Sequence, residues 1–322
     1  MGTFFIVGPT ATGKSQLAAG VAREIGAEIV SADAFQIYRG LDLLTAKPDA
    51  AMLAKAPHHL IGTTPLHQEM NAEKYRRAVS HAIDGIHSRG KLAIVVGGSG
   101  LYIKALTHGL AVLPQVDPML RAKLNALSMD QLRLQLADLD PETAREIDTK
   151  NRRRLVRALE VCLTTGNRAS EQRTQWAVAP IAGIVDPSRP GSPPPATTSG
   201  VFVFRDREEL YARINQRVEA MFQNGVIEEV RAAGPMSSTA SQMIGLREIR
   251  QVLDGKISIS QCIAAIQQAT RRYAKRQLTW FRRQTNFEPL NLSLLSHNEA
   301  VRWFLLRQHS GPRKLSGVRP KG

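Results

Sequence analysis

The segment GPTATGKS, Gly8 to Ser15, begins directly after the apolar run FFIV and constrains the fold more than any other part of the chain. It fits G-x-x-x-x-G-K-[ST], the phosphate-binding loop (P-loop) that joins a strand to a helix. In such a loop backbone N–H groups surround a phosphate, a lysine (here Lys14) reaches its outer oxygens, and a hydroxyl (here Ser15) coordinates Mg²⁺. The sequence therefore predicts a phosphate ligand, without saying which phosphate compound it is.

Short apolar runs rich in β-branched residues predict buried parallel strands at Thr3–Val7, Glu28–Val30 and Leu92–Val96. Helical patterns lie between them, at Lys14–Ile25 and Asn71–Ser88, which predicts an α/β fold with a P-loop-type parallel sheet flanked by helices. Each strand is followed by a polar or glycine-rich turn: GPTATGKS, SADAFQ or GGSGLY. Because the carboxyl ends of parallel strands share one edge of a sheet, these three turns should form a single site.

The rest of the chain changes character twice. From Val116 to Trp176 the periodicity is helical, and residues 180–200 are rich in Pro, Gly and Ser. We therefore expect a discontinuous P-loop core, interrupted by an all-helical insertion with a Pro-rich connection and followed by a disordered basic tail. The expected division, in chain order, is core, insertion with connection, core and tail: residues 1–113, 114–199, 200–310 and 311–322.

The second part of the core should open with another strand, VFVF at Val201–Phe204. Asp206 can cap a helix that runs to about Ala232, and a last long helix should begin near Ser258. The expected buried stripe of the first of these helices contains five residues, namely Leu210, Ile214, Val218, Met221 and Phe222.

Asp33, just past the second strand, is a candidate general base. Two plainer interpretations remain open: a solvated turn residue, or a carboxylate that holds Mg²⁺ as in nucleotide kinases. The third strand ends in Gly97, Gly98 and Ser99 and lacks the carboxylate expected in a hydrolase or kinase. The absence of this carboxylate argues against hydrolysis of a nucleoside triphosphate or phosphoryl transfer from it.

Excess positive charge points to a polyanionic partner. The formal net charge is +15 and the pI about 10.3. Residues 270–322 carry 12 Lys and Arg against two Glu, and residues 149–176 carry seven against two Glu. In RRYAKRQLTWFRR, four residues should form one helical face beside three aromatic residues, a mixture suited to phosphates and splayed bases. They are Arg272, Arg276, Thr279 and Arg283, with Tyr273, Trp280 and Phe281.

Two other basic segments are less informative. Arg213 and Arg217 are one helical turn apart and can point together at an anion, and Arg153, Arg154 and Arg157 accompany an apolar stripe. Spacing alone favours a solvated basic face for both segments.

The sequence also limits cofactors and location. Cys162 and Cys262 lack the spacing for a zinc site and cannot form a disulfide framework, which favours the cytoplasm. His58 and His59 have no carboxylate or Cys at ligand spacing, so we expect them to pack rather than to bind metal. No apolar run approaches the roughly 20 residues that cross a bilayer.

Taken in order, these motifs resemble the bacterial tRNA dimethylallyltransferases, or tRNA isopentenyltransferases. The resemblance runs from Phe4 to about Arg283 through GPTATGKS, SADAFQIYRG, LTAKPD, APHHL, VVGGSGLYIKAL, RRLVRALEV, QMIGLREI and KRQLTWFRR. It implies transfer of a dimethylallyl group from dimethylallyl diphosphate to N6 of the adenosine 3′-adjacent to the tRNA anticodon. The P-loop would then hold an isoprenoid diphosphate, and a monomer with no obligate protein partner is expected.

The resemblance also implies roles for individual residues. Asp33, Ser99 and Arg217 would be catalytic, and Ser15 would hold Mg²⁺. The diphosphate-binding residues would be Gly8, Pro9, Thr10, Ala11, Thr12, Gly13, Lys14 and Ser15. The tRNA-binding residues would be Asp33, Ala34, Phe35, Gln36, Arg153, Arg154, Leu155, Val156, Arg157, Gln242, Met243, Ile244, Gly245, Leu246, Arg247, Lys275, Arg276, Gln277, Leu278, Thr279, Trp280, Phe281 and Arg282.

The chain departs from the family's usual pattern at four positions. Leu44 stands where Gly is usual, Gly62 where Asp is usual, and Ser99 and Gly100 replace Thr and a larger residue. Two other functions remain as alternatives: a P-loop kinase of a small metabolite or nucleotide, and an RNA-binding protein that keeps the loop as a scaffold. A kinase predicts ATP turnover, whereas a pure binder predicts no turnover at all.

Overall fold

The computed structural model describes residues 2–109, 117–174, 200–284 and 286–309. The chain divides into two compact units, residues 1–107 with 181–322, and residues 108–180. The expected Pro-rich connection, apart from Gly200 at its end, and the basic tail lie outside the described residues. None of the described helices is long and apolar enough to cross a membrane.

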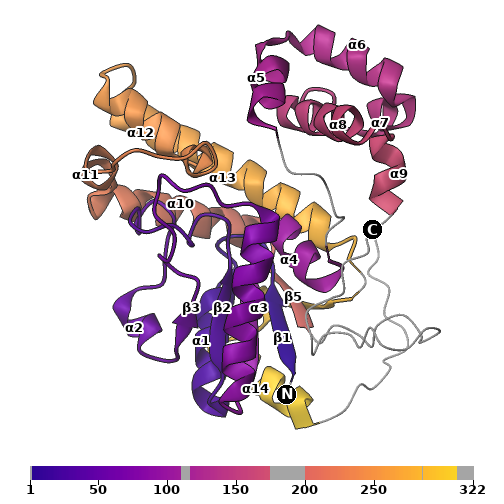
Figure 1. Ribbon diagram of the computed structural model, residues 1–322. Coiled ribbons are helices and arrows are strands. Elements are labelled where there is room, and N and C mark those ends of the chain that lie inside the picture. The colour runs from indigo at the N-terminus through magenta and orange to yellow at the C-terminus, as the bar shows by residue number, and fades with distance from the viewer. Residues whose placement is uncertain (1, 110–116, 175–199, 285, 310–322) are drawn as a thin grey trace, which may run out of the picture. The chain divides into compact units, whose positions relative to one another are not determined.

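The larger unit contains a parallel sheet, as the sequence predicted (Figure 1). Its described strands follow the order β3-β2-β4-β1-β5-β6. Their bounds are β1 Thr3–Val7, β2 Glu28–Ala32, β3 His58–His59, β4 Ala93–Gly97, β5 Gly200–Phe204 and β6 Glu288–Asn291. The neighbours of β1 are β4 and β5, with Ile6 opposite Val96 and Val201. Strands far apart in the chain therefore present their carboxyl ends side by side.

Helices cover both faces of this sheet. Their bounds are α1 Lys14–Ile25, α2 Ala50–Leu53, α3 Ala72–Ser88, α4 Gly100–Thr107, α10 Arg207–Gln223, α11 Val226–Arg231, α12 Leu246–Leu253, α13 Ile259–Phe281 and α14 His297–His309, with 3-10 turns at Ala240–Gln242 and Leu292–Leu294. Local signals set several of the ends. The Asn71 side chain accepts from the N–H of Lys74 at the start of α3, and Ser258 and Gln261 form a capping box on α13.

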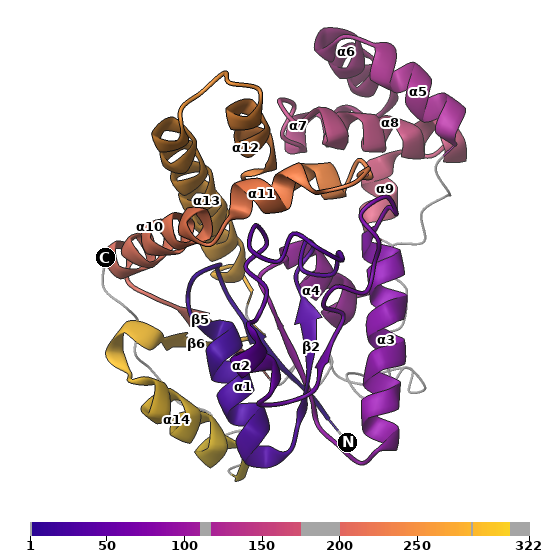
Figure 2. The same cartoon turned by 90° about the vertical axis from the view of Figure 1, so that its left-hand side faces the viewer.

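The alternation of side chains along each strand divides the core into two layers. Phe5 and Val7 of β1 pack on one face, together with α3, α4, α10 and α13. Ile6 points to the other face, where α1 and α14 contribute residues such as Leu17 and Phe304. Figure 2 shows α1 and α14 on one side of the sheet and α3 on the other.

The structure corrects two expectations for the second part of the core. The helix expected from Asp206 to about Ala232 ends at Gln223, because Gly225 adopts a left-handed conformation with φ 90° and begins the separate helix α11. The Asp206 side chain makes no capping hydrogen bond; its Oδ1 accepts instead from Asn291 on β6. The long helix α13 begins as predicted, but it is followed by β6 and α14, which the sequence analysis did not anticipate.

Residues 117–174 of the smaller unit form helices joined by short turns, as predicted. Its helices are α5 Pro118–Ala126, α6 Met129–Leu139, α7 Pro141–Glu146, α8 Arg152–Thr165 and α9 Ala169–Thr174. Its apolar core includes Leu132 and Leu136 of α6 and Leu155 and Leu159 of α8. The buried carboxylate of Glu160 pairs with guanidinium groups from α5 and α8, so part of the basic charge of this unit is used internally.

Candidate active site

A pocket of about 250 Å³ lies at the carboxyl ends of β1, β2 and β4. All three turns that follow these strands line it, through Lys14 of the P-loop, Asp33 after β2 and Gly97 at the end of β4. Arg217 of α10 and Tyr273 of α13 complete it. The expectation that the three turns form one site is confirmed, and we call this site the strand-end pocket.

The P-loop has a tight backbone that only certain residues tolerate. An ideal Cβ on Gly8 would lie 2.1 Å from the carbonyl oxygen of Val203, so the close approach of β5 requires glycine there. Ala11 and Gly13 have φ of 65° and 93°, in the left-handed region. The buried hydroxyl of Thr12 donates to the carbonyl oxygen of Pro9 and closes the loop on itself.

Three side chains from distant segments hold the P-loop in place. Gln277 of α13 accepts from the N–H of Thr10 at 3.0 Å and donates to the carbonyl oxygen of Gly98 at 2.8 Å. Arg213 donates to the carbonyl oxygen of Ala11, and Arg205 to that of Thr12. The family resemblance implied a tRNA contact for Gln277, and no sequence motif pointed to Arg205. No local signal identifies either contact, because these partners lie more than 190 positions from the loop.

The cationic end of the pocket is prepared for an anion. Desolvation lowers the pKa of Lys14 to about 8; the neighbouring Asp33 opposes this shift, and Arg217 adds to it. Desolvation also lowers the pKa of Arg217, whose buried Nε has no hydrogen-bond partner. A buried donor without an acceptor is costly, and a diphosphate oxygen would remove that cost. The prediction from spacing that Arg213 and Arg217 lie on a solvated surface is wrong, since both line the strand-end pocket.

Asp33 has one oxygen engaged and one available. Its Oδ1 accepts from the N–H groups of Phe35 at 2.9 Å and Gln36 at 3.3 Å, which fixes the turn after β2. Among the described residues, no donor bonds to Oδ2. The carboxylate is therefore oriented by its own turn while its second oxygen remains able to accept a proton.

Ser99 and Tyr273 lie next to this carboxylate. The buried Ser99 hydroxyl accepts from the N–H of Ala34 at 3.0 Å, so it joins the turn after β4 to the turn after β2. Burial and the charge of Asp33 raise the pKa of Tyr273, and a hydrogen bond to Ser99 opposes that rise. Tyr273 is therefore a neutral hydroxyl within the pocket.

Part of the lining of the strand-end pocket is apolar. It contains Leu44, Val218, Met221, Met243 and Ile266 from four different segments. Leu44, the residue that replaces the family's usual Gly, is 6 % exposed. Its Cδ1 lies so close to Gly245 that an ideal Cβ there would be 3.1 Å away. This substitution therefore adds an apolar side chain to the pocket wall.

The structure also shows the surroundings of Gly62 and Gly100, two other positions that differ from the family's usual residues. Gly62 has a φ of 63°, and a Cβ there would lie 3.8 Å from the ammonium nitrogen of Lys47. Lys47 instead pairs with Asp42 at 2.6 Å. A Cβ on Gly100 would lie 2.8 Å from the indole of Trp280, so the smaller residue lets α13 pack against α4.

The predicted tRNA-binding segments differ in how they expose their side chains. In α13, Lys275 and Arg276 are exposed, while Phe281 and Gln277 are buried. In the turn before α12, Met243 and Ile244 line the strand-end pocket, and Gln242 precedes them; Gly245 begins the helix, Leu246 is buried and Arg247 is exposed. In α8 of the smaller unit, Arg153 and Arg154 are exposed, and Leu155 and Val156 belong to its core.

The histidines pack at the edge of the sheet. His59 pairs with the buried carboxylate of Glu28 at 2.7 Å, and His58 bonds to the carbonyl oxygen of Ala56. In the described part of the chain, no group of three or more His, Cys, Asp or Glu could hold a metal ion. Cys162 and Cys262 are free and buried.

Comparison with known proteins agrees with this architecture. A model of the family described as IPP transferase matches residues 36–284. The chain belongs to the IPP transferase family. It is 41% identical over 282 residues to a tRNA dimethylallyltransferase of Akkermansia muciniphila, covering 88% of this chain and 90% of the relative. A tRNA dimethylallyltransferase of Phenylobacterium zucineum is 40% identical over 313 residues, covering 95% and 97%.

Solved structures of family members match as well. The full-length tRNA isopentenylpyrophosphate transferase of Bacillus halodurans aligns with a TM-score of 0.66 and 30% identity, over 96% of this chain and 95% of that one. A eukaryotic dimethylallyltransferase acting on tRNA aligns with a TM-score of 0.77 over 98% of this chain and 82% of the other. Because that pair is only 22% identical, it supports the fold alone.

Proposed function

We propose that this family member transfers a dimethylallyl group from dimethylallyl diphosphate to N6 of the adenosine 3′-adjacent to the tRNA anticodon, and releases diphosphate. The observation that carries the proposal is the composition of the strand-end pocket. Lys14 and Arg217 form a cationic end, Asp33 offers a carboxylate, and Leu44 and Ile266 belong to an apolar wall. These parts match a diphosphate, an attacking amine and a five-carbon chain.

The leaving group is stabilised by the cationic end. As the bond between C1 and the diphosphate oxygen breaks, negative charge grows on the diphosphate. The P-loop N–H groups, the Lys14 ammonium and the unpartnered Nε–H of Arg217 can neutralise that charge. The apolar wall holds the prenyl chain and keeps water from the electron-poor carbon.

The nucleophile is served by Asp33. The N6 amine of adenosine is weakly nucleophilic, because its lone pair is delocalised into the ring. As the bond between N6 and C1 forms, the nitrogen loses a proton, and Oδ2 of Asp33 can accept it. Ser99 holds the turn beside this carboxylate, and Tyr273 offers a hydroxyl group within the pocket.

The residues of the site fit a Mg²⁺ ion bound mainly through the substrate. The Ser15 hydroxyl lines this pocket and would hold the ion, which in such sites takes few protein ligands. When bound, the ion supplies further charge neutralisation to the diphosphate. The role of the protein is to place Ser15 at the first turn of α1, beside the Lys14 ammonium.

The predicted tRNA segments supply the second substrate's contacts in this proposal. Lys275, Arg276 and Arg282 would contact phosphates at the end of α13, and Arg153 and Arg154 of the smaller unit would add others. Extraction of the target base from its loop costs a few kcal/mol, which phosphate and stacking contacts must offset. The two free, buried cysteines support a cytoplasmic location.

The deciding experiment is a product assay. The protein is incubated with labelled dimethylallyl diphosphate, Mg²⁺ and bulk tRNA, and the RNA is digested to nucleosides. We expect labelled isopentenyladenosine and RNA-dependent release of diphosphate. Label in no nucleoside, together with ATP turnover and a phosphorylated small molecule, would favour the P-loop kinase instead, and no turnover of either substrate would favour a pure RNA binder.

A further inference from the structure

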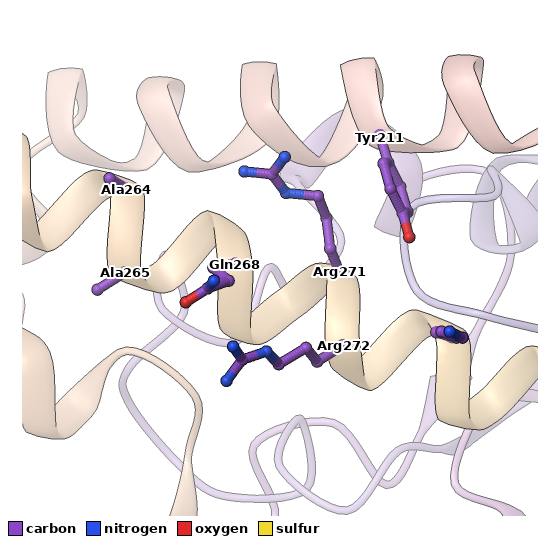
Figure 3. Close-up of a pocket in the computed structure, with 7 residues that line it drawn as sticks. Tyr211, Ala264, Ala265, Gln268, Arg271 and Arg272 are labelled. Carbon is purple, nitrogen blue, oxygen red and sulfur yellow. The ribbon is translucent and has the colours of Figure 1, made fainter.

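A second cavity lies on the side of α13 that faces away from the strand-end pocket. It measures about 440 Å³ and is lined by Tyr211, Ala264, Ala265, Gln268, Arg271, Arg272 and Lys275. Figure 3 shows Arg271 and Arg272 extending from α13 while Tyr211 descends from the facing helix α10. Residues two positions apart on a helix differ by about 200° in direction, so Gln268 and Arg272 point away from Ile266 and Thr270. We call this cavity the outer groove.

The cations of the outer groove lack acidic partners. Among the described residues, Arg271, Arg272 and Lys275 form no ion pair with a carboxylate, and no acidic side chain lines the groove. Many other arginines of the chain are paired, as Arg76 is with Glu73. Like charges one helical turn apart repel each other. Their concentration here without compensation is typical of a surface that binds an anion.

Tyr211 holds part of this charge in a fixed position. The guanidinium carbons of Arg207 and Arg271 lie 5.3 and 5.8 Å from the centre of its ring, within the range of cation–π attraction. Arg271 also donates from Nε to the carbonyl oxygen of Gln267. A guanidinium group fixed in this way loses little freedom when it binds a phosphate through its remaining N–H groups.

The shape of the charged surface favours an extended anion. Arg276 continues the row of cations along α13, and Arg282 and Arg283 follow its last residue, again without ion pairs to described carboxylates. At 1.5 Å per residue, the row from Arg271 to the end of α13 is roughly 15 Å long. A small free anion cannot span such a row, whereas a nucleic acid backbone places phosphates along it.

We propose that the outer groove binds phosphodiester groups of the substrate tRNA that lie several nucleotides away from the adenosine in the strand-end pocket. The proposal rests on the proposed function for its choice of tRNA. The body of α13, which with side chains is about 10 Å across, separates the groove from the pocket. An RNA that places one base in the pocket therefore reaches the groove only with a more distant part of its backbone.

The test compares two RNAs on one double variant, Arg271→Ala with Arg272→Ala. Binding to a full tRNA and to an oligonucleotide of the anticodon loop alone is measured by fluorescence anisotropy over a series of salt concentrations. For the tRNA we expect a Kd about tenfold higher and a slope of log K against log salt reduced by about 1.5, because each lost phosphate contact removes roughly 0.7 to 0.9 from the slope. For the loop oligonucleotide we expect a Kd within about twofold of the unmodified protein, a ratio that corresponds to little lost free energy.

The control variant carries the same loss of charge elsewhere. Arg23→Ala with Arg77→Ala removes two exposed arginines of α1 and α3, and should leave both binding curves unchanged. Thermal unfolding of each variant checks that the fold is retained. Tyr211→Phe keeps the ring and should preserve tRNA binding, whereas Tyr211→Ala should weaken it about threefold, since the guanidinium groups of Arg207 and Arg271 are no longer held.

The outcomes separate this proposal from the proposed function. An unaltered salt slope for the tRNA, or an equal loss for both RNAs, overturns the outer groove as a site for distant phosphates. If the unmodified protein forms no isopentenyladenosine and the double variant still loses only tRNA affinity, the groove stands and the proposed reaction fails. If product forms and the slopes match those of the Arg23 and Arg77 control, the reaction stands and the groove fails.

Discussion

The two faces of α13 differ in how their polar groups are satisfied. On the inner face, Tyr273 lines the strand-end pocket, and Gln277 is buried with both ends of its amide bonded to the loops of that pocket. On the outer face, Arg271 and Lys275 border an open groove and have no described acidic partner. One helix thus carries a side chain that bonds the pocket loops and cations that have no described acidic partner. Changes on the two faces should therefore alter different measured quantities.

The largest expected effect belongs to the pocket that the inner face closes. Asp33→Asn keeps an oxygen that accepts from Phe35 and Gln36, so the turn should survive, but an amide cannot take the N6 proton. We expect kcat to fall by roughly 10² to 10⁴. The Kd for tRNA should stay within a few fold. Single-turnover prenylation and tRNA binding are the measurements.

The matched control is Asp84→Asn, an exposed carboxylate on α3. It should leave kcat unchanged. If Asp33→Asn and Asp84→Asn both retain full turnover, Asp33 takes no part in the proton transfer. The pocket on the inner face of α13 would then lack its proposed general base.

The next largest effect tests the hydrogen bonds that the inner face of α13 makes to the pocket loops. Gln277→Leu removes the bonds to the N–H of Thr10 and the carbonyl oxygen of Gly98 while keeping a side chain of similar size. We expect kcat/KM for dimethylallyl diphosphate to fall by roughly 10- to 100-fold, since a small displacement of the P-loop disturbs the geometry of transfer. The salt slope of tRNA binding should not change. A changed slope with normal kcat/KM would instead identify Gln277 as an RNA contact.

A third effect depends on pH and tests the cationic end of the pocket. Burial first, and then Arg217, lower the pKa of Lys14 to about 8, while Asp33 opposes the shift. Lysine is charged below its pKa, so the affinity for the diphosphate should be full below about pH 8. Above that value it should fall, by up to tenfold per pH unit, as free Lys14 loses its proton. Calorimetric titration with a non-reactive diphosphate analogue from pH 6.5 to 9.5 measures the effect.

Lys14→Arg is the control for this profile, because a guanidinium stays charged throughout the range. Its affinity should be lower at pH 7 but should show no fall near pH 8. A profile of the unmodified protein that stays flat to pH 9.5 would mean that the Lys14 proton does not control diphosphate binding.

The smallest expected effect is on the outer face. Lys275→Ala removes one exposed cation where the outer groove meets the end of α13. The Kd for tRNA should rise by a few fold, and the salt slope should decrease by about 0.8, as for one phosphate contact. Anisotropy titrations at several salt concentrations are sufficient. If kcat falls while the slope stays constant, the two faces of α13 are not functionally separate.

Much of the site could be predicted before the fold was known. The pattern of Thr3–Val7 followed by GPTATGKS predicted the P-loop, and the order of strands predicted that Asp33 and Lys14 would meet. These inferences succeeded because each rests on a short segment or on a general property of parallel sheets. Strand β6 and helix α14 were missed, since EPLN is too short and too polar to show a strand pattern, and α14 has a weak apolar stripe.

The sequence could not assign the partners of arginine. By spacing, Arg213 and Arg217 resemble a solvated surface, whereas Arg271 and Arg272 belong to a segment that the sequence predicts to contact nucleic acid. The structure turns the first pair toward the P-loop and leaves the second pair at the outer groove. A guanidinium group at the end of a long side chain can reach either environment, so periodicity alone does not choose between them.

By itself, the sequence determined that the chain forms a parallel α/β sheet with a P-loop at its carboxyl edge, because strand periodicity and the P-loop are local properties. Only the tertiary structure decided that Gln277 and Arg205 hold that loop. It also decided that the polar groups on one face of α13 are hydrogen-bonded, whereas the cations on the other face have no described acidic partner. Those contacts join segments separated by most of the chain. Their geometry arises from packing against the completed sheet, which no local pattern of residues encodes.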